Sequence, residues 1–450
     1  MQILHANAPD FEGRWKRLCT RGSDEDEAGV REAAGAIVAD VRARGDAALL
    51  EYTRRFDGWA PRTAADLVAD PAHLAAAWRS LPAAGRNALR VAAGRIESFH
   101  RRETDAVVRP YRDRLGARLG QVSRPLARVG LYVPGGTARY PSSVLMTAIP
   151  ARVAGVGEVV AVSPADRATG KVDAWTLAAC HVAGVSRLFR VGGAQAVAAL
   201  AHGTRTVPAV DKICGPGNAY VAAAKRVVFG TVDIDMIAGP SEVLVLADGS
   251  ASPAQAAADL LAQAEHDPRA VPVLVATSEA MARATHAEVM RQLRGLPREE
   301  IARRAIAGRG AIVLARGLAH AVKLADEFAP EHLVLLVKDA GKLVPRISRA
   351  GAIFVGSRTP EAIGDYVAGP SHVLPTAGTA RFASPLSVAT FRRRMSVVEM
   401  SPRSLASLAP VVEALAAAEG LEAHARAVRV RLPDRTDRPV RKARRTARRG

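Results

Sequence analysis

From Arg128 onward, short runs rich in β-branched residues alternate with alanine-rich stretches of helical character. Strands that alternate with helices along a chain form βαβ units, in which the strands lie parallel and helices cover the sheet. This alternation predicts an α/β fold with two parallel sheets. The expected strands are residues 129–133, 159–162, 187–191, 211–214, 243–246, 271–276, 311–314, 333–337 and 352–355.

Helical patterns flank the alternating region on both sides. Residues 24–105 place apolar side chains such as Val30 and Ile37 at helical spacing, and residues 404–430 do the same with side chains such as Leu408. We therefore expect helical segments at both ends of the chain. The C-terminal one is of the kind that packs on a partner subunit, which favours a homodimer.

The chain of 450 residues has a formal net charge of +19 that is unevenly distributed. Residues 431–450 carry nine Arg or Lys against two Asp, a net charge of +7. A Pro- and Arg-rich end without an apolar period is expected to be a disordered, basic tail. It has no aromatic residue on which a base could stack, so a nucleic-acid-binding function rests on charge alone and is the weaker hypothesis.

No segment approaches the roughly 18 uninterrupted apolar residues that a membrane-spanning helix needs. The N-terminal residues include an acidic cluster at 24–27 and lack the apolar core of a signal peptide. We therefore expect a cytoplasmic protein with no membrane partner.

The three cysteines, Cys19, Cys180 and Cys214, have no CxxC spacing. This argues against a disulfide framework and against a metal site made of cysteines. Cys214 precedes a glycine turn, where a covalent thiohemiacetal mechanism is an alternative. No histidine adjacent in sequence would activate it, so a structural role is favoured.

Glu331 and His332 place a carboxylate directly beside an imidazole, where a helical pattern gives way to the apolar run 333–337. Open α/β sheets build their ligand sites in the crevice at element ends. Neutral imidazole titrates in the range that suits proton abstraction, and a neighbouring carboxylate can activate a water molecule. The pair predicts proton-transfer chemistry in such a crevice.

Three glycine-rich turns follow expected strands: residues 134–136 (PGG), 192–195 (GGAQ) and 215–218 (GPGN). Glycine lets a backbone approach a phosphate closely, and the helix that follows each turn has an N-terminal dipole that favours an anion. Tight strand-to-helix turns also need glycine for structural reasons alone. Because a complete GxGxxG fingerprint is absent, the turns by themselves do not identify a dinucleotide.

Scattered polar residues could hold a divalent cation. Gln263 and His266 are three apart on an expected helix and share a face, while Asp365 and His372 lie in a turn-rich region. Such pairs are also ordinary on helix surfaces. A mixed set of nitrogen and oxygen ligands suits zinc or manganese, and the spacing is diagnostic of neither.

Glu419 and His424 lie five residues apart near Gly420. In a straight helix that spacing would separate the two side chains by about 140°. They therefore need different partners, or a helix must start between them.

A series of short strings occurs in one order along the chain: residues 130–136 (GLYVPGG), 212–218 (KICGPGN), 234–236 (IDM), 238–242 (AGPSE), 263–266 (QAEH), 329–333 (APEHL), 364–366 (GDY) and 372–376 (HVLPT). In combination and order, these strings resemble the histidinol dehydrogenase family over about residues 20–430. Only the basic tail is left out.

The resemblance implies a zinc-dependent, NAD-linked enzyme that oxidises L-histidinol through L-histidinaldehyde to L-histidine, in the last steps of histidine biosynthesis. It implies one Zn²⁺ per subunit, NAD⁺ as co-substrate, and a homodimer with shared active sites. The implied fold is two incomplete Rossmann-like parallel-sheet domains with N- and C-terminal helical extensions. The expected segments are 1–29 (helical extension), 30–131 with 243–386 (main domain), 132–242 (nucleotide-binding-like domain), 387–430 (helical extension) and 431–450 (tail).

Residue roles carry over motif by motif. The catalytic residues would be Glu331 and His332. The metal ligands would be Gln263, His266, Asp365 and His424, the last from the other subunit. The cofactor contacts would be Tyr132, Gln195 and Asn218. The substrate contacts would be Ser241, Gln263, His266, His332, Asp365, His372, Glu419 and His424.

An alternative within the same fold is an enzyme that oxidises another primary alcohol to a carboxylate. Such an enzyme would keep Glu331 and His332 but lose the residues that bind the imidazole ring of the substrate. His372, Glu419 and His424 are all present, which favours histidinol.

Overall fold

The computed structural model describes residues 1–21, 27–104, 106–135 and 139–433. Gly136 of the first glycine turn and residues 434–450 of the expected tail lie outside the described residues. The chain divides into two compact units. The main unit comprises Met1–Thr104 and Pro125–Arg392, and the small unit comprises Asp105–Arg124 and Arg393–Gly450.

One half of the main unit is built on a six-stranded sheet, called sheet A here, in which all strands are parallel. The order β12-β11-β10-β13-β14 is the 3-2-1-4-5 order of a Rossmann half, and β1 is added at the edge. The strands are β1 (Gln2–His5), β10 (Glu242–Ala247), β11 (Val271–Ala276), β12 (Ala311–Leu314), β13 (His332–Leu336) and β14 (Ala352–Val355).

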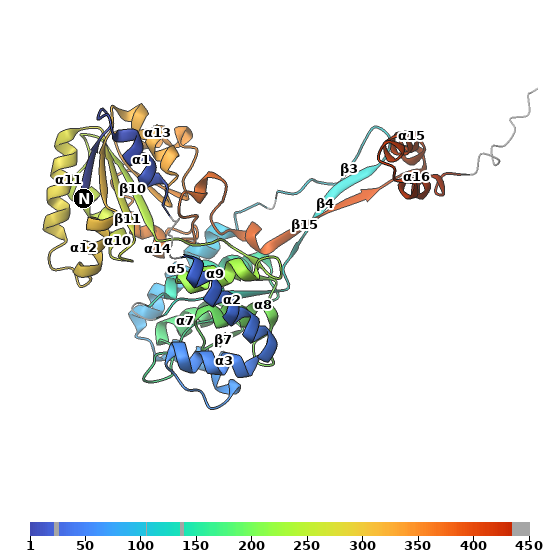
Figure 1. Cartoon of the computed structure of the whole chain (residues 1–450), viewed down its shortest axis with the longest axis horizontal. Helices are drawn as coiled ribbons and strands as arrows, with labels where there is room; N and C mark the ends of the chain where they lie inside the picture. The colour runs from blue at the N-terminus through green and yellow to red at the C-terminus, as the bar shows by residue number, and fades with distance from the viewer. Residues whose placement is uncertain (22–26, 105, 136–138, 434–450) are drawn as a thin grey trace, which may run out of the picture. The chain divides into compact units, whose positions relative to one another are not determined.

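Both faces of sheet A are buried, as parallel sheets require. Successive residues of β10 point to opposite faces: Val243 packs in one apolar cluster and Leu244 in the other. The first cluster includes residues of α10 (Pro253–Ala264), α11 (Glu279–Gln292) and α12 (Glu299–Gly308), and the second includes residues of α1 (Phe11–Cys19) and α13 (Leu318–Phe328). Figure 1 shows these two helical layers around β10 and β11.

The other half of the main unit repeats this plan in a second sheet, called sheet B, of order β2-β7-β6-β5-β8-β9. Its five later strands are parallel and again follow the order 3-2-1-4-5, whereas β2 joins the edge antiparallel. The strands are β2 (Val68–Ala69), β5 (Arg128–Tyr132), β6 (Glu158–Val162), β7 (Arg187–Phe189), β8 (Lys212–Cys214) and β9 (Asp233–Ile234).

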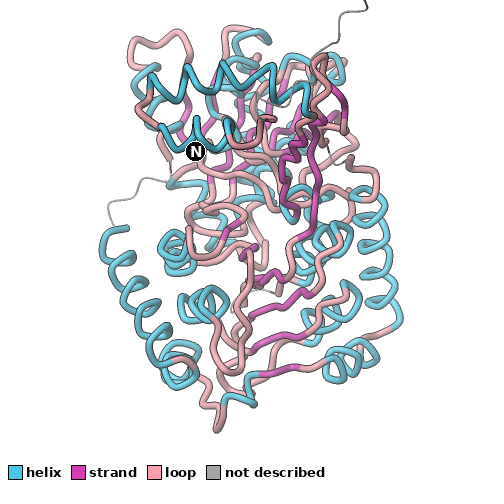
Figure 2. The backbone as a smooth tube through the Cα atoms, turned by 90° about the vertical axis from the view of Figure 1, so that its right-hand side faces the viewer, coloured by secondary structure: helices cyan, strands magenta, loops and turns pink. Residues whose placement is uncertain are grey.

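Helices cover both faces of sheet B, and Figure 2 shows its strands as a ladder between two helical layers. One apolar cluster includes α2 (Glu27–Arg44), α3 (Asp46–Tyr52), α8 (Gly193–His202) and α9 (Ala219–Val228). The other includes α4 (Pro71–Ser80), α5 (Ala83–His100), α6 (Pro141–Ala154) and α7 (Ala174–Ala183).

All nine strands expected from the sequence are present, with ends that move by no more than two residues. The α/β fold with two parallel sheets is therefore confirmed. Strand β1, which pairs with β12, falls within residues 1–29, where only helix was expected. A four-residue strand is too short to display a period that could distinguish it from a loop.

The small unit contains a three-stranded sheet of order β15-β4-β3, in which β3 and β4 are antiparallel. It also contains two helices over the region where helical structure was expected, residues 404–430. The elements are β3 (Tyr111–Arg112), β4 (Arg118–Pro125), β15 (Arg392–Glu399), α15 (Pro402–Ala418) and α16 (Glu422–Arg429). Gly420, with φ of 70°, ends α15, so a new helix does start between Glu419 and His424.

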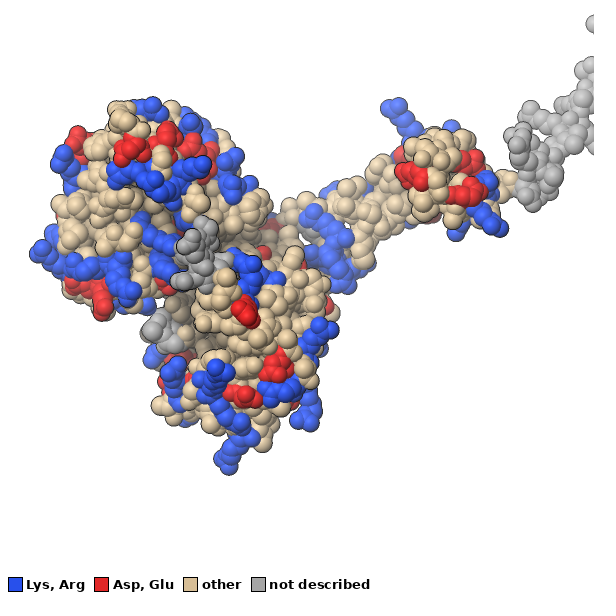
Figure 3. Space-filling view, viewed as in Figure 1, with Lys and Arg blue, Asp and Glu red and all other residues tan. Residues whose placement is uncertain are grey.

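None of the described helices combines the length and hydropathy that a bilayer crossing demands. On the face drawn in Figure 3, basic and acidic side chains are interspersed over much of the main unit, and this view gives no sign of a continuous basic track along it.

Candidate active site

A cleft of about 1220 Å³ lies within the main unit, and residues of both sheets line it. Sheet B contributes the turn after β8, from Gly215 to Asn218, at the carboxyl ends of its strands. Sheet A contributes Ser241, just before β10, with Glu331 and His332 at the start of β13. The cleft therefore uses the carboxyl edge of one sheet and the amino edge of the other, whereas Rossmann sheets ordinarily bind ligands at carboxyl edges.

His332 is buried at the first position of β13, with 3% of its surface exposed. Its Nδ1 lies 2.9 Å from the backbone carbonyl oxygen of Glu242. A carbonyl oxygen only accepts hydrogen bonds, so Nδ1 carries the proton and the lone pair of the neutral ring is on Nε2. Burial lowers the pKa of His332, which favours the neutral ring that a general base needs.

Glu331 is buried beside it, and its Oε2 accepts a hydrogen bond of 2.8 Å from the Glu242 backbone N–H. The same Oε2 lies 3.7 Å from Nδ1 of His332. Burial, with the negative charge of Glu242 as the next cause, raises the pKa of Glu331 well above its usual value. A carboxylate in this setting is a stronger base than an exposed one.

Three of the four predicted metal ligands line this cleft: Gln263, His266 and Asp365. Nε2 of His266 lies 3.9 Å from Oδ2 of Asp365. Gln263, on α10, is 1% exposed, and its buried Oε1 has no hydrogen-bond partner among the described residues. A buried amide oxygen without a partner is costly, and a cation would satisfy it. The donor set thus fits a divalent metal with nitrogen and oxygen ligands.

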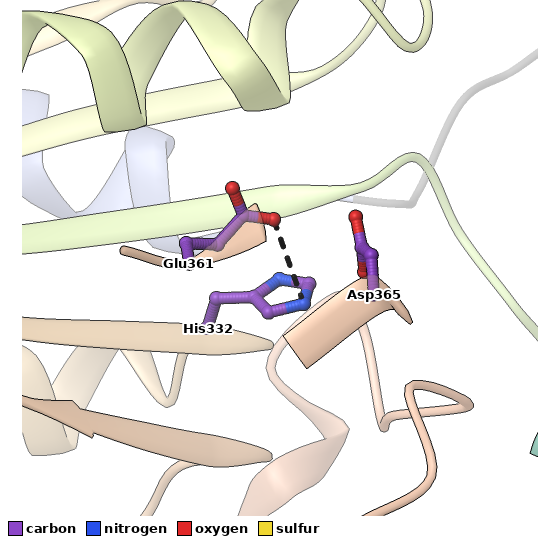
Figure 4. Close-up of side chains that lie close together, drawn as sticks. All are labelled: His332, Glu361 and Asp365. Atoms are coloured by element: carbon purple, nitrogen blue, oxygen red, sulfur yellow. Dashed lines mark ion pairs between the residues drawn. The ribbon is translucent and has the colours of Figure 1, made fainter. Parts of the chain in front are cut away.

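Glu361 is a site residue that sequence reasoning missed. It immediately precedes α14 (Ala362–Tyr366), and its Oε1 lies 3.9 Å from Nε2 of His332. Glu361, His332 and Asp365 each offer one ligand atom within 4.8 Å of the others, and Figure 4 shows them around one space. Glu361 is four residues before Asp365, a helical spacing that would have identified it as a neighbour.

The Glu361 carboxyl is 1% exposed, and within the part of the chain that the structure describes neither of its oxygens has a hydrogen-bond partner. Burial, followed by the charge of Asp365, raises its pKa well above the usual range. Burial therefore favours the uncharged form of this carboxyl, and a cation nearby would favour the charged form.

His372 and Ser241 also line the cleft. Nδ1 of His372 lies 3.1 Å from the backbone oxygen of Asp365, so it carries the proton of this ring. Burial lowers the pKa of His372, which favours a neutral imidazole. The structure thus gathers six predicted substrate contacts around one cleft: Ser241, Gln263, His266, His332, Asp365 and His372.

The three predicted cofactor residues lie on sheet B and its turns. Asn218 lines the cleft and caps α9, where its side chain accepts a hydrogen bond of 3.1 Å from the Val221 N–H. Tyr132 and Gln195 are buried and do not line the cleft. The Tyr132 hydroxyl accepts a hydrogen bond from Gly193 N–H, so it supports the second glycine turn from within.

Glu419 and His424 belong to the small unit, where both side chains are exposed. The predicted set is therefore divided between two units of the chain.

Cys214 is fully buried in β8, and burial raises the pKa of its thiol well above the usual value. A thiol held neutral is a poor nucleophile, which agrees with the structural role favoured for it.

Comparisons with known proteins agree with one another. The family model of histidinol dehydrogenase matches residues 20–432. The histidinol dehydrogenase of Syntrophotalea carbinolica is 52% identical over 434 residues, which is 96% of this chain and all of that protein. That of Chromobacterium violaceum is 50% identical and covers 97% of this chain and all of its own length. The crystal structure of histidinol dehydrogenase from Elizabethkingia anophelis has a TM-score of 0.89 at 33% identity and covers 96% of this chain and 97% of its own.

Proposed function

Because the chain belongs to the histidinol dehydrogenase family, which consists of oxidoreductases of histidine biosynthesis, we propose that it oxidises L-histidinol through L-histidinaldehyde to L-histidine. Each of the two steps passes one hydride to NAD⁺. The observation that carries this proposal is the buried pair Glu331 and His332 in one cleft with Gln263, His266 and Asp365, whose side chains offer nitrogen and oxygen atoms suited to a metal.

His332 is the general base of the alcohol oxidation. Its unprotonated Nε2 takes the hydroxyl proton as the carbinol carbon gives its hydride to NAD⁺, which leaves the aldehyde. The Glu242 carbonyl supports this role because it keeps the ring proton on Nδ1. It also stabilises the imidazolium that forms.

Glu331 serves the second step, in which the aldehyde must first add water. Its carboxylate removes a proton from that water as the oxygen bonds to the aldehyde carbon, and the resulting hydrate then gives the second hydride. The raised pKa of Glu331 supports the assignment, since it makes this carboxylate more basic.

Gln263, His266 and Asp365 would hold a zinc ion together with His424 of the second subunit. A bound zinc ion would supply a positive charge and open coordination positions, which orient a substrate that has both an imidazole and an amine. His372 and Ser241 are placed to contact that substrate, and Glu419 would reach it from the second subunit. The partnerless Oε1 of Gln263 supports this ligand set.

The dinucleotide binds on the side of the cleft that is lined by the turns of sheet B. The turn from Gly215 to Asn218 opens α9, whose free N–H groups favour a phosphate. Asn218 fixes that helix end, and Tyr132 accepts a hydrogen bond from Gly193 in the neighbouring turn. Gln195 follows that turn, two residues after Gly193.

The enzyme acts as a homodimer with shared sites. The small unit exposes large apolar side chains, which on a soluble enzyme are commonly covered by another protein surface. Among the described residues they include Val108, Tyr111, Met395, Val397, Val398, Met400, Val411, Leu415, Leu421 and Val430.

The stoichiometry of the reaction tests the proposal. Purified enzyme loaded with zinc should form two NADH for each histidinol consumed, with histidine as the product detected by chromatography. One NADH per histidinol would indicate an ordinary alcohol dehydrogenase. Treatment with a chelator should abolish turnover and added zinc should restore it, whereas full activity of metal-free enzyme would reject the ligand set.

A further inference from the structure

The two acid/base residues share one neighbour, Glu242, which opens β10. Its backbone N–H donates to Oε2 of Glu331 at 2.8 Å. Its backbone carbonyl accepts from Nδ1 of His332 at 2.9 Å. The backbone of a single residue therefore orients both side chains.

The side chain of Glu242 is itself held at three points. Oε1 accepts from Nε of Arg21 at 2.6 Å, and Oε2 accepts from Nη2 of Arg21 at 2.8 Å. Oε1 also accepts from the Ala377 N–H at 2.8 Å. The Glu242 and Arg21 side chains are 1% and 5% exposed, so this bidentate ion pair is shielded from water.

Arg21 also contacts the segment that leads into the pair. Its Nη2 donates to the Phe328 carbonyl at 2.7 Å, and its guanidinium lies 3.4 Å from the centre of the Phe328 ring. Phe328 ends α13, three residues before Glu331. The next residue, Ala329, has φ of 47°, which is strained for a residue with a Cβ. One guanidinium thus ties the start of β10 to the turn before β13.

We propose that Glu242 is a positioning residue for both steps of the reaction, and that Arg21 fixes it by joining β10 to the end of α13. This inference rests on the proposed roles of Glu331 and His332. A buried ion pair is often no more stabilising than apolar residues of the same volume. The main effect of the ion pair between Arg21 and Glu242 is to fix the position of Glu242. The Glu242 backbone can orient two catalytic side chains only while it is itself held in place.

Glu242→Gln is the main test, because it keeps the volume of the side chain and an acceptor for Ala377. It removes the charge and turns an N–H donor toward Arg21. We expect kcat for histidinol oxidation to fall about tenfold to a hundredfold, as displaced supporting groups cause elsewhere. The KM values for histidinol and NAD⁺ should stay within about threefold, since no binding group is removed.

The two half-reactions give a readout that a loss of stability alone would not produce. Because Glu242 holds both residues, alcohol oxidation and the oxidation of added histidinaldehyde should slow by similar factors. All rates are referred to folded, zinc-loaded enzyme, measured by metal content and by thermal unfolding. Equal half-reaction losses in that fraction support the inference, and a kcat within about twofold of the wild-type value in both half-reactions overturns it.

Glu158→Gln is a matched control. Glu158 opens β6 of sheet B as Glu242 opens β10, and it pairs with Arg187 at 2.9 Å and with Arg128. It does not line the cleft. This variant should lose some stability while its kcat stays unchanged. An equal loss of kcat in the control would overturn the inference, since breaking any ion pair at the start of a strand would then have the same effect.

Arg21→Lys and a double variant complete the test and replace Glu242→Gln if that protein does not fold. Lysine keeps the charge but loses the fork that reaches both Glu242 and Phe328, so kcat should again fall in both half-reactions. If the two residues act as one unit, Arg21→Met combined with Glu242→Gln should be no slower than the worse of Arg21→Met alone and Glu242→Gln alone. Additive losses would reject the joint action. If wild-type enzyme did not oxidise histidinol, the proposed function would fail instead, which is a distinct result.

Discussion

At the scale of single residues, the chemistry depends on which nitrogen of His332 carries the proton. The Glu242 carbonyl fixes it on Nδ1, and the free Nε2 faces Glu361 at 3.9 Å. Glu331, by contrast, has one oxygen engaged by the Glu242 N–H. The two neighbours therefore differ in environment, and this difference would permit the different steps proposed for them.

Substitution of each residue should separate the two oxidations. His332→Asn removes the base and should slow alcohol oxidation by about a hundredfold or more, the usual contribution of a general base. Glu331→Gln should slow aldehyde oxidation more than alcohol oxidation, because only the former needs an activated water. Single-turnover NADH formation from histidinol and from histidinaldehyde measures both, and equal losses in Glu331→Gln would contradict the division of roles.

Asp57 makes a pH-dependent contribution to stability on sheet B. Burial raises its pKa to about 6, although its Oδ2 accepts a hydrogen bond from Gly192 N–H. A carboxyl whose pKa is higher in the folded state binds more protons when folded, so stability falls as pH rises from about 4 through 6. Above that range the buried charge costs about 1–3 kcal/mol.

Asp57→Asn removes this charge and keeps an oxygen for the Gly192 N–H. The unfolding temperature of the metal-free variant should exceed that of the wild type at pH 8, and the two should converge as pH falls toward 4. Asp66→Asn is the control, since the Asp66 pKa is lowered by its hydrogen bonds and the substitution should destabilise at pH 8. An Asp57→Asn difference that does not change with pH would exclude this explanation.

The residues that could be predicted are those whose function lies in their own side chains. Glu331 and His332 are adjacent in sequence, and Gln263 and His266 share a helical face. Glu242 could not be found in this way, because it acts on the pair through backbone atoms that every residue possesses. Arg21 lies 221 residues from its partner, and no local pattern relates the two.

At the scale of elements, each strand of the two sheets leads into a turn whose residues decide what that edge can bind. The α9 end shows this most clearly, since Asn218 both caps the helix and lines the cleft. The cap contributes to stability, whereas the free N–H groups of the first turn are available to a ligand.

Two substitutions at Asn218 separate these roles. Asn218→Asp keeps the cap but adds a negative charge, so stability should be retained while the KM for NAD⁺ rises about three- to tenfold. Asn218→Ala should cost about 1 kcal/mol of stability through loss of the cap. Ser278→Asp adds the same charge at the N-cap of α11, outside the cleft, and should leave this KM unchanged. An unchanged KM in Asn218→Asp would place the dinucleotide elsewhere.

Strand positions could be predicted because the β-branched runs are distinct from the alanine-rich helices between them. The sequence could not predict which edge of each sheet lines the cleft. In sheet B the cleft follows the rule for open sheets and lies after β8. In sheet A it lies before β10 and β13, because the facing turn of sheet B meets that edge. Which edges face each other depends on tertiary packing, which the spacing of strands does not encode.

At the scale of the whole molecule, both sheets have the strand order 3-2-1-4-5. Right-handed crossovers and the need to cover both faces of a parallel sheet lead to this order with many different sequences. The repeated strand order therefore needs no repeated sequence.

Complementation tests the sharing of sites between subunits. His332→Asn and His424→Asn should each be nearly inactive alone. If His424 serves the site of the other subunit, a refolded equal mixture should regain about a quarter of wild-type activity, because half of the dimers are mixed and each has one intact site. Refolding each variant by itself is the control. No gain in the mixture would mean that His424 acts within its own chain.

The carboxyl edge of sheet B faces the amino edge of sheet A across the cleft. The two sides of the cleft therefore have partial charges of opposite sign. The wall made by sheet B presents the N-terminal end of α9, where partial positive charge gathers. The wall made by sheet A presents the C-terminal end of α10, where partial negative charge gathers beside Gln263. A polyanion and a cation can therefore occupy one cavity at the same time, each against the wall that attracts it.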